Sequence, residues 1–397
     1  MKNLLIIANW MQGTALSGGD KILIELTRRW LKKLHISFFI SMEGDKICRQ
    51  EGLELDKKRI WSSDFFSGFY LIDGIYRVIW SVFHAFRITI NKGDIVLSSS
   101  DFLPDSIPAF ILKLRRPDIK WVASFYLFAP KPWDRKSPYK GAQWLLGLTY
   151  WLSQLPAYYL IKNFADLVFV TSQPDVNSFI TKKRSTNEVI VVRGGVDVLL
   201  AKEYFKSKEF IFSNKRPYDA CFVGRFHYQK GILELIQIWE KVCKKQPHRR
   251  LAIIGVGPLE QKTRKLIGQL KIQNNVDLLG FLSGGRKFDI FKKSKIVLHP
   301  ATYDSGGMAA AEAMAWGLPG VSFDLEALKT YYPKGILKTR CFDFNEFSEN
   351  ILYLLTNPDA YQILSQEALH LINEEWDWDK QAQKIFHQLT GDTPIKD

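Results

Sequence analysis

Three short segments of the chain, residues 17–20, 224–231 and 304–312, place glycines beside charged side chains. Each segment lies where a predicted strand is followed by a predicted helix. Glycines let a backbone approach a ligand closely, and the free amides at a helix N-terminus favour an anion. The three segments together indicate binding of a phosphorylated small molecule. For each segment taken alone, a simple glycine turn flanked by solvated charges is the alternative.

The second segment carries two cations, Arg225 and Lys230, between Gly224 and Gly231. Arginine offers a planar fork of donors to phosphate oxygens, whereas lysine acts as a point charge. The pair sits at a strand end and a helix start, where both side chains can reach the same ligand. We therefore predict that these two residues bind a diphosphate without a metal ion.

The third segment opens a helix that we expect over residues 309–315, because alanine favours helix and Gly317 and Pro319 end it. Glu312 lies inside this helix. A carboxylate at that position can accept hydrogen bonds from two hydroxyl groups, such as those of a ribose. An alanine-rich packing helix with one tolerated glutamate is the alternative.

The elements that would position these residues alternate between strands and helices along the whole chain, which is typical of parallel sheets with crossover helices. A helix is expected over residues 20–34. The expected strands are 4–9, 35–41, 94–99, 121–126, 166–172 and 189–197 in the first half, and 218–226, 250–257, 276–282, 295–301 and 317–323 in the second. The prediction is an α/β protein with two Rossmann-like parallel-sheet domains.

A chain of 397 residues is long enough for two domains. We predict an N-terminal domain over residues 1–200 and a C-terminal domain over 215–375, with residues 376–397 as a closing helix. The charged stretch 201–217 lacks an apolar period and is expected to be a linker. Ligands gather at the carboxyl ends of strands in open parallel sheets, so the loops that follow the strands are the places to look for a site.

The chain is basic, with a formal charge of +14. Such a charge favours an anionic partner, which could be a nucleic acid, a phosphorylated small molecule or an acidic membrane surface. Its four cysteines are scattered and have no partner at metal-ligand spacing, which indicates free thiols in a reducing compartment. The apolar start of the chain is too short for a signal-peptide core and is expected to be the first buried strand.

Two segments, residues 65–90 and 144–161, are apolar almost all round. Residues 144–161 contain no charge, but polar residues and a proline dilute them, and their aromatic side chains suit the headgroup level of a bilayer. Three alternatives stay open for both segments: ordinary buried helices, contact with a membrane surface, or a membrane span.

In combination and in order, the motifs resemble those of the retaining glycosyltransferases of family four, which have the GT-B fold. The resemblance spans nearly the whole chain. It rests on V-T-S-Q at residues 170–173, G-G-V-D at 194–197, the G-R-x-x-x-x-K-G block at 224–231, G-x-G-P at 255–258, and an E-x7-E block with Asp304 in its first acidic position, followed by A-M-A-x-G-L-P. It implies that the two domains face each other across a cleft that holds the donor.

By this resemblance, Arg225 and Lys230 would neutralise the diphosphate of the donor and of the departing nucleotide, and Glu312 would hold the ribose. Asp304 stands where the family usually has glutamate, which contacts the donor sugar. Because aspartate is shorter, the identity of the sugar stays open. The residues expected to line the donor site are Gly18, Gly19, Gly224, Gly257, Leu282, Ser305, Gly306, Gly307 and Met308.

The first domain would bind the acceptor, with Asp101 and Tyr126 on the acceptor side. Many relatives carry a histidine in the loop after the strand at 121–126, but this chain has none there. The resemblance implies retention of anomeric configuration by a front-face route, in which the departing phosphate can take the acceptor proton. We therefore predict no general base, and catalysis by positioning and charge stabilisation.

The predicted activity is that of a hexosyl-type glycosyltransferase, which moves a sugar from a nucleoside-diphosphate sugar to a glycan or lipid-linked acceptor in cell-surface polysaccharide or glycolipid synthesis. No metal cofactor and no nucleic-acid partner are expected. The expected location is the cytoplasm, with residues 131–161 contacting an anionic membrane surface. The alternatives are a sugar-nucleotide epimerase of the same fold and a non-catalytic nucleic-acid-binding protein.

Overall fold

The structure is a computed structural model that describes residues 1–12, 16–54, 58–61, 70–134, 137–304 and 307–391. The chain divides into two compact units. Unit 1 comprises Met1–Pro132, Gly141–Gly194 and Trp378–Asp397, and unit 2 comprises Trp133–Lys140 and Gly195–Asp377. A short segment from within the first 200 residues thus belongs to unit 2.

Unit 1 is built on a seven-stranded parallel sheet with the order β3-β2-β1-β4-β5-β6-β7. Its strands are β1 (Asn3–Ala8), β2 (His35–Ser41), β3 (Lys58–Trp61), β4 (Ile95–Ser98), β5 (Lys120–Phe125), β6 (Leu167–Val170) and β7 (Val189–Val191). The order reverses between β1 and β4, which puts a topological switch point at the carboxyl ends of these two strands.

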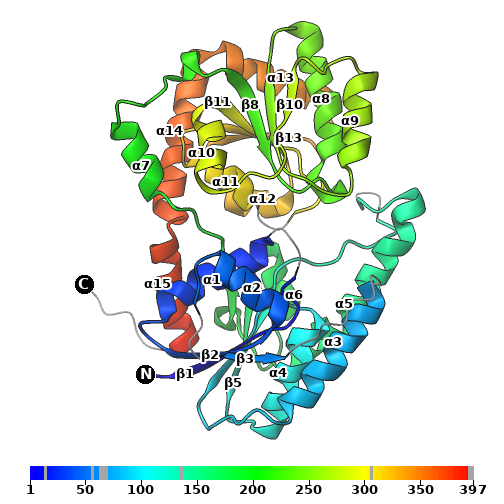
Figure 1. The fold of residues 1–397 in the computed structure, drawn as a ribbon, viewed down its shortest axis with the longest axis vertical. Helices are drawn as coiled ribbons and strands as arrows, with labels where there is room; N and C mark the ends of the chain where they lie inside the picture. Colours follow the sequence, from blue (N-terminus) through cyan, green and yellow to red (C-terminus); the bar gives the residue numbers. More distant parts are fainter. Residues whose placement is uncertain (13–15, 55–57, 62–69, 135–136, 305–306, 392–397) are drawn as a thin grey trace. The chain divides into compact units, whose positions relative to one another are not determined.

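The helices of unit 1 cover both faces of this sheet (Figure 1). They are α1 (Gly18–Trp30), α2 (Met42–Gln50), α3 (Tyr70–Ala85), α4 (Leu103–Arg115), α5 (Trp144–Phe164), α6 (Val176–Phe179) and α15 (Trp378–Thr390). Helices α1 and α2 lie on one face and α4 on the other, where α3 and α5 both pack against α4. Helix α15 packs on α1, and Trp30 Nε1 donates a hydrogen bond to the carbonyl of Ala382 (3.0 Å).

Unit 2 repeats the arrangement with a six-stranded parallel sheet of order β10-β9-β8-β11-β12-β13. Its strands are β8 (Tyr218–Val223), β9 (Leu251–Ile254), β10 (Val276–Leu278), β11 (Ser294–His299), β12 (Gly320–Phe323) and β13 (Ile336–Thr339). Its helices are α7 (Leu199–Lys206), α8 (Ile232–Lys245), α9 (Glu260–Gln269), α10 (Gly284–Lys292), α11 (Met308–Met314), α12 (Glu326–Tyr331), α13 (Phe344–Thr356) and α14 (Pro358–Glu375).

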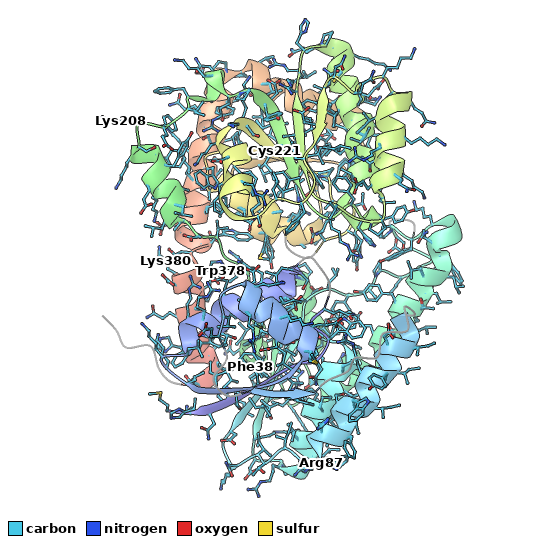
Figure 2. All side chains as sticks on the ribbon, in the orientation of Figure 1. Phe38, Arg87, Lys208, Cys221, Trp378 and Lys380 are labelled. Atoms are coloured by element: carbon cyan, nitrogen blue, oxygen red, sulfur yellow. The ribbon has the colours of Figure 1, made fainter. Side chains whose placement is uncertain are left out.

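The four inner strands of unit 2, β8, β9, β11 and β12, are largely buried on both faces, as apolar parallel strands should be. On β8, Cys221 (labelled in Figure 2) belongs to the core cluster that includes α11, whereas Phe222 belongs to the cluster that includes α8. The prediction of an α/β protein with two parallel sheets is therefore confirmed.

The structure corrects two expectations from the sequence. The stretch 201–217, expected as a linker, contains part of helix α7, whose Tyr204 is buried in the core of unit 2. Strands β3 and β13 were not expected, because each has four residues and contains a lysine, which hides the apolar pattern.

Both apolar segments contain long helices, α3 in the first and α5 in the second. Within the described part of the chain, no helix combines the length and the hydropathy needed to cross a bilayer. Many large apolar side chains on these two helices are nevertheless exposed.

Candidate functional site in unit 2

The first part of the candidate site is the loop after β8, which carries Arg225. Phe226 is buried in the core and anchors this loop, and its backbone amide donates to the carbonyl of Val256 in the neighbouring loop (2.9 Å). Arg225 itself is exposed, and its guanidinium has no hydrogen bond or ion pair with the described residues. The loop therefore presents an unpaired cation at the carboxyl end of the sheet.

Lys230 lies at the end of a single 3-10 turn, directly before α8. Gly231 follows it in the left-handed region (φ 66°), and a Cβ atom there would lie 1.9 Å from the carbonyl oxygen of Pro300. Only glycine fits such a close approach. Gly231 thus brings the Lys230 turn against the loop that follows β11, where Thr302 donates its amide to the carbonyl of Gln229 (3.0 Å).

These two loops join Lys230 to Asp304. The Lys230 Nζ atom lies 2.6 Å from Asp304 Oδ2, and His299 Nε2 lies 3.4 Å from the same oxygen. Burial alone would raise the pKa of Asp304, but Lys230 and His299 outweigh it and hold this pKa well below its usual range. Asp304 is therefore an anion that neutralises Lys230 when no ligand is bound.

The loop that carries Asp304 leads into α11 through Gly307. Gly307 has a φ of 85°, and a Cβ atom there would lie 2.9 Å from His299 Nε2. The buried Tyr332 hydroxyl donates to the carbonyl of Gly307 and accepts a hydrogen bond from the amide of Ala311 (3.0 Å). Tyr332 thus holds the start of α11 in place, and Gly307 leaves room for the His299 ring.

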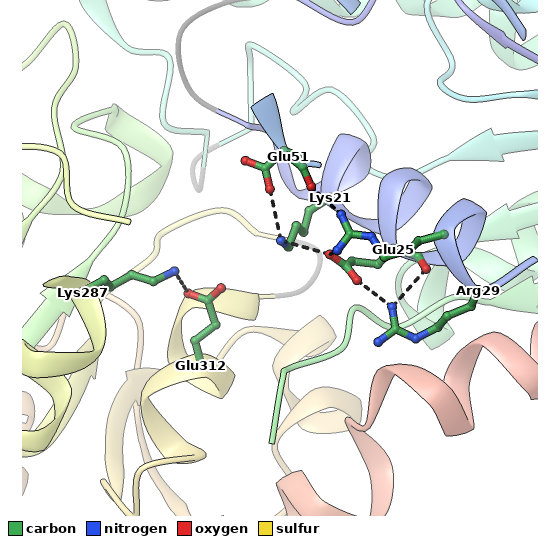
Figure 3. A network of polar contacts seen from close by, with 7 residues as sticks. Lys21, Glu25, Arg29, Glu51, Lys287 and Glu312 are labelled. Atoms are coloured by element: carbon green, nitrogen blue, oxygen red, sulfur yellow. Dashed lines mark hydrogen bonds and ion pairs between the residues drawn. The ribbon is translucent and has the colours of Figure 1, made fainter. Parts of the chain in front are cut away.

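Glu312 lies on α11 and pairs with Lys287 of α10, at 2.6 Å between Nζ and Oε2 (Figure 3). The other carboxylate oxygen of Glu312 is not part of this ion pair, and the Glu312 side chain is partly exposed. Sequence reasoning expected Glu312 but missed Lys287, since the two are far apart in the sequence and only the packing of α10 beside α11 joins them.

The other predicted donor residues of unit 2 lie in the same loops or near them. Gly224 follows β8 directly, Gly257 contacts the backbone of Phe226, and Leu282 comes just before α10. Met308 is the first residue of α11 and packs against the core. Ser305 and Gly306 fall outside the described residues.

Two further side chains near Arg225 were not expected from the sequence. The ring of Tyr139, from the short segment Trp133–Lys140, lies edge-on to the ring of His227, with centroids 6.3 Å apart. Burial and the positive charges of Arg225 and Lys230 lower the pKa of His227 to about 4, so this histidine is neutral at neutral pH. No sequence signal pointed to Tyr139, because its place against unit 2 depends on the fold.

In unit 1, the predicted residues Gly18, Gly19 and Tyr126 come together at the start of α1. The Ser17 hydroxyl caps this helix by accepting from the amide of Asp20 (3.1 Å). A Cβ atom on Gly19 would lie 2.7 Å from the Tyr126 ring. The glycine therefore leaves room for the tyrosine.

Asp101, the other predicted acceptor-side residue, follows β4 and is buried. Gln154 of α5 donates a hydrogen bond from Nε2 to its Oδ2 (2.7 Å). Burial raises the pKa of Asp101 to about 6, and burial also raises the pKa of Tyr126, to which the charges of Asp20 and Asp101 add. Unit 1 thus places two carboxyl groups, of Asp20 and Asp101, and the phenol of Tyr126 at the carboxyl edge of its sheet.

Among the residues that the structure describes, no group of three or more histidine, cysteine, aspartate or glutamate side chains could hold a metal ion. The cationic pair of Arg225 and Lys230 is the arrangement in unit 2 that suits an anionic ligand.

Comparison with known proteins relates the region that carries these loops to a protein family. Residues 204–370 match the family model of glycosyl transferases group 1. An uncharacterized glycosyltransferase of Methanocaldococcus jannaschii is 29% identical over 241 residues, which cover 55% of this chain and 55% of that relative. The chain thus spans about half the length of this curated relative.

Solved structures resemble the whole chain. HepE from Anabaena, in complex with UDP and glucose, superimposes with a TM-score of 0.71 at 16% identity, covering 98% of this chain and 100% of that one. The fold is GT-B. A mutant of TarM from S. aureus, in complex with fondaparinux, alpha-GlcNAc-glycerol and UDP, gives 0.70 at 13% identity, with 98% and 100% coverage. At these identities the likenesses show the fold, and the region that matches the family of glycosyl transferases group 1 lies within it.

Proposed function

We propose that the chain is a retaining, hexosyl-type glycosyltransferase that takes its sugar from a nucleoside-diphosphate sugar. The observation that carries this proposal is the pair of cations Arg225 and Lys230, positioned at the carboxyl edge of a parallel sheet within the family-matched region. A diphosphate is the ligand that two such cations suit, because arginine and lysine both bind phosphate oxygens strongly. UDP is the first nucleotide to test, since HepE and TarM were both solved with it.

In the proposed reaction, the diphosphate replaces Asp304 as the partner of Lys230 and recruits the unpaired Arg225. The negative charge that grows on the departing nucleotide would meet both cations, which accelerates cleavage of the sugar–phosphate bond. Glu312 would accept hydrogen bonds from the ribose. No metal ion is needed to balance the charge in this scheme, and addition of a chelator should leave the rate unchanged.

The acceptor in this proposal is a glycan or a lipid-linked sugar, used in cell-surface polysaccharide or glycolipid synthesis. Unit 1 would receive it, because Asp101 and Asp20 with Tyr126 offer hydrogen-bond acceptors and an aromatic ring to sugar hydroxyls. The enzyme would work in the cytoplasm, at the surface of an anionic membrane.

A thermal-shift screen against UDP, GDP and their sugars tests the proposal, because a ligand that binds the native state raises the melting temperature. UDP or GDP should stabilise the wild type. Lys230→Ala should lose this shift, whereas Lys244→Ala, an exposed lysine on α8, should keep it. Product analysis by mass spectrometry must then find a transferred or hydrolysed sugar. An epimerised donor as the sole product would overturn the proposal.

A further inference from the structure

Helix α3 of unit 1 exposes a row of large apolar side chains. Its five exposed large apolar side chains are Ile72, Ile75, Ile79, Phe83 and Phe86, the last just beyond its C-terminus. They are spaced three or four residues apart, so they form one stripe along one side of the helix. In a globular protein such a stripe normally faces the core.

The inner side of α3 packs Tyr76 and Trp80 against the core and also carries buried polar groups. Asp73, Arg77 and Ser81 are buried. Arg77 donates a hydrogen bond to the carbonyl of Asn9 (2.8 Å) and pairs with Glu43. These contacts fix the rotation of the helix about its axis, because turning the stripe inward would leave the guanidinium without its partners. The exposure of the stripe is therefore built into unit 1.

A cluster of arginines lies at the C-terminal end of the stripe. Arg87 stacks on the ring of Phe83, with its guanidinium carbon 4.0 Å from the ring centroid (Figure 2 labels Arg87). Arg115, at the end of α4, donates to the carbonyls of Ala85 (2.7 Å) and Ile88 (3.0 Å), and Arg116 follows it and is exposed.

Exposed negative charge is scarce among the described residues of α3 and of the loop after α4. The one acidic residue of α3, Asp73, is buried, and among the residues of the loop after α4 only Asp118 is an exposed acid. An apolar stripe that ends in cations suits a surface with a hydrocarbon interior and phosphate groups at its boundary with water. That is the composition of an anionic bilayer.

We propose that the stripe of α3 (Ile72, Ile75, Ile79, Phe83 and Phe86), with Arg87 and Arg116, docks unit 1 on an anionic lipid bilayer. The helix would lie in the plane of the interface, with its Ile and Phe side chains among the acyl chains and its arginines at the phosphates. This inference rests on the proposed function, because it names the surface that brings the enzyme to a lipid-linked acceptor. It places the main contact on α3 rather than on residues 131–161.

Vesicle co-sedimentation of the full chain tests the proposal, with vesicles of equal parts phosphatidylglycerol and phosphatidylcholine, and of phosphatidylcholine alone. The wild type should sediment with the anionic vesicles and bind the neutral ones much more weakly. Ile75→Ser combined with Ile79→Ser should lower the partition coefficient about tenfold or more, because two apolar side chains lose their burial.

The control for this variant is Ile363→Ser, on α14 of unit 2. Ile363 is 58% exposed, against 62% for Ile79, so the chemical change is matched while the location differs. Ile363→Ser should sediment like the wild type. Arg87→Ala with Arg116→Ala should reduce binding about fivefold for each arginine and weaken its dependence on salt. Arg115 is left intact because it bonds backbone carbonyls.

Three results would overturn the proposal. The first is unchanged sedimentation of the α3 variant. The second is loss of binding on Leu145→Ser with Leu146→Ser in α5 while the α3 variant still binds. The third is a concentration-dependent dimer that the α3 substitutions abolish, which would assign the stripe to a second copy of the chain. The UDP-induced thermal shift is measured on the same variants and should not change. A missing UDP shift in the wild type would count against the proposed function alone.

Discussion

The carboxyl edges of the two sheets carry opposite chemistry although both units share one architecture. In unit 2 the edge presents Arg225 and Lys230, and its buried carboxylate, Asp304, is held ionised by the lysine. In unit 1 the edge presents Asp101 and Tyr126, and burial raises the pKa of both groups. The same fold thus stabilises a charged carboxylate in one unit and favours a protonated one in the other.

This difference follows from what lies beside each carboxyl group. Asp304 has a lysine 2.6 Å away, whereas Asp101 has a neutral amide, Gln154, at 2.7 Å. A cation offsets the cost of burying a carboxylate, but a single neutral hydrogen bond does not. The comparison fits the proposed division of work, in which unit 2 would bind an anion and unit 1 would bind hydroxyl groups.

The largest effect is expected when the cations of unit 2 are removed. We expect Lys230→Ala and Arg225→Ala each to lower the rate of sugar transfer about 100-fold or more, because each removes a positive charge from the departing diphosphate. Steady-state rates with a sugar nucleotide measure this. Lys244→Ala should be unaffected. A loss of less than about tenfold in both variants would mean that the charge is balanced elsewhere.

The pH dependence of stability tests the comparison at Asp101. Its pKa is raised from 3.8 to about 6, so the native state holds this proton more tightly than the unfolded state does. The stability that the group contributes is therefore present below its unfolded pKa and is lost as the pH rises through about 6. Asp101→Asn cannot ionise. Between about pH 4 and pH 7 we expect its free energy of unfolding to gain about 2 to 3 kcal/mol relative to the wild type.

Urea unfolding of both proteins across this pH range measures the effect. If the difference in the free energy of unfolding between Asp101→Asn and the wild type stays constant with pH, the pKa of Asp101 is not raised by folding. The contrast between Asp101 and Asp304 would then be wrong.

Asp304 can be tested by removing its charge alone. We expect Asp304→Asn to bind UDP several-fold more tightly, since Lys230 loses the internal anion that competes with the diphosphate. Titration calorimetry measures the affinity. Asp289→Asn, an exposed site on α10, is the control. Weaker binding in Asp304→Asn would mean that Asp304 positions Lys230 instead of competing for it.

The smallest expected effect concerns Glu25 of α1, which lies between Lys21 and Arg29 (Figure 3) and is also paired with Arg28. Burial alone would raise its pKa, but these three cations lower it overall, so Glu25 resembles Asp304 although it lies in unit 1. A lowered pKa contributes stability above the unfolded value of 4.5 and loses it as the pH falls.

Glu25→Gln should therefore cost about 1 kcal/mol at neutral pH and nothing in acid, the opposite trend to Asp101. Thermal melts at several pH values measure it. Asp379→Asn removes only an outlying partner of Arg29, on a side chain that is almost fully exposed, and should change the melting temperature little.

Much of the framework could be predicted from the sequence. Apolar runs such as residues 35–41 marked the long buried strands, because a strand covered on both faces needs apolar residues throughout. The glycines of residues 224–231 indicated a loop between a strand and a helix, and the structure has this loop between β8 and α8, whereas its binding of phosphate stays a prediction. Short strands with charged residues, such as β3 and β13, were missed because their pairing depends on neighbours that are distant in the sequence.

What the tertiary structure alone decided is which side chains meet and which faces stay exposed. Lys230 and Asp304 are 74 residues apart, and their ion pair exists because β8 and β11 are neighbours in one sheet. Helix α3 is apolar almost all round, so its composition could not say which side faces outward. The partners of Arg77 decide that, because a buried guanidinium must be paired, and they leave the stripe of isoleucine and phenylalanine exposed.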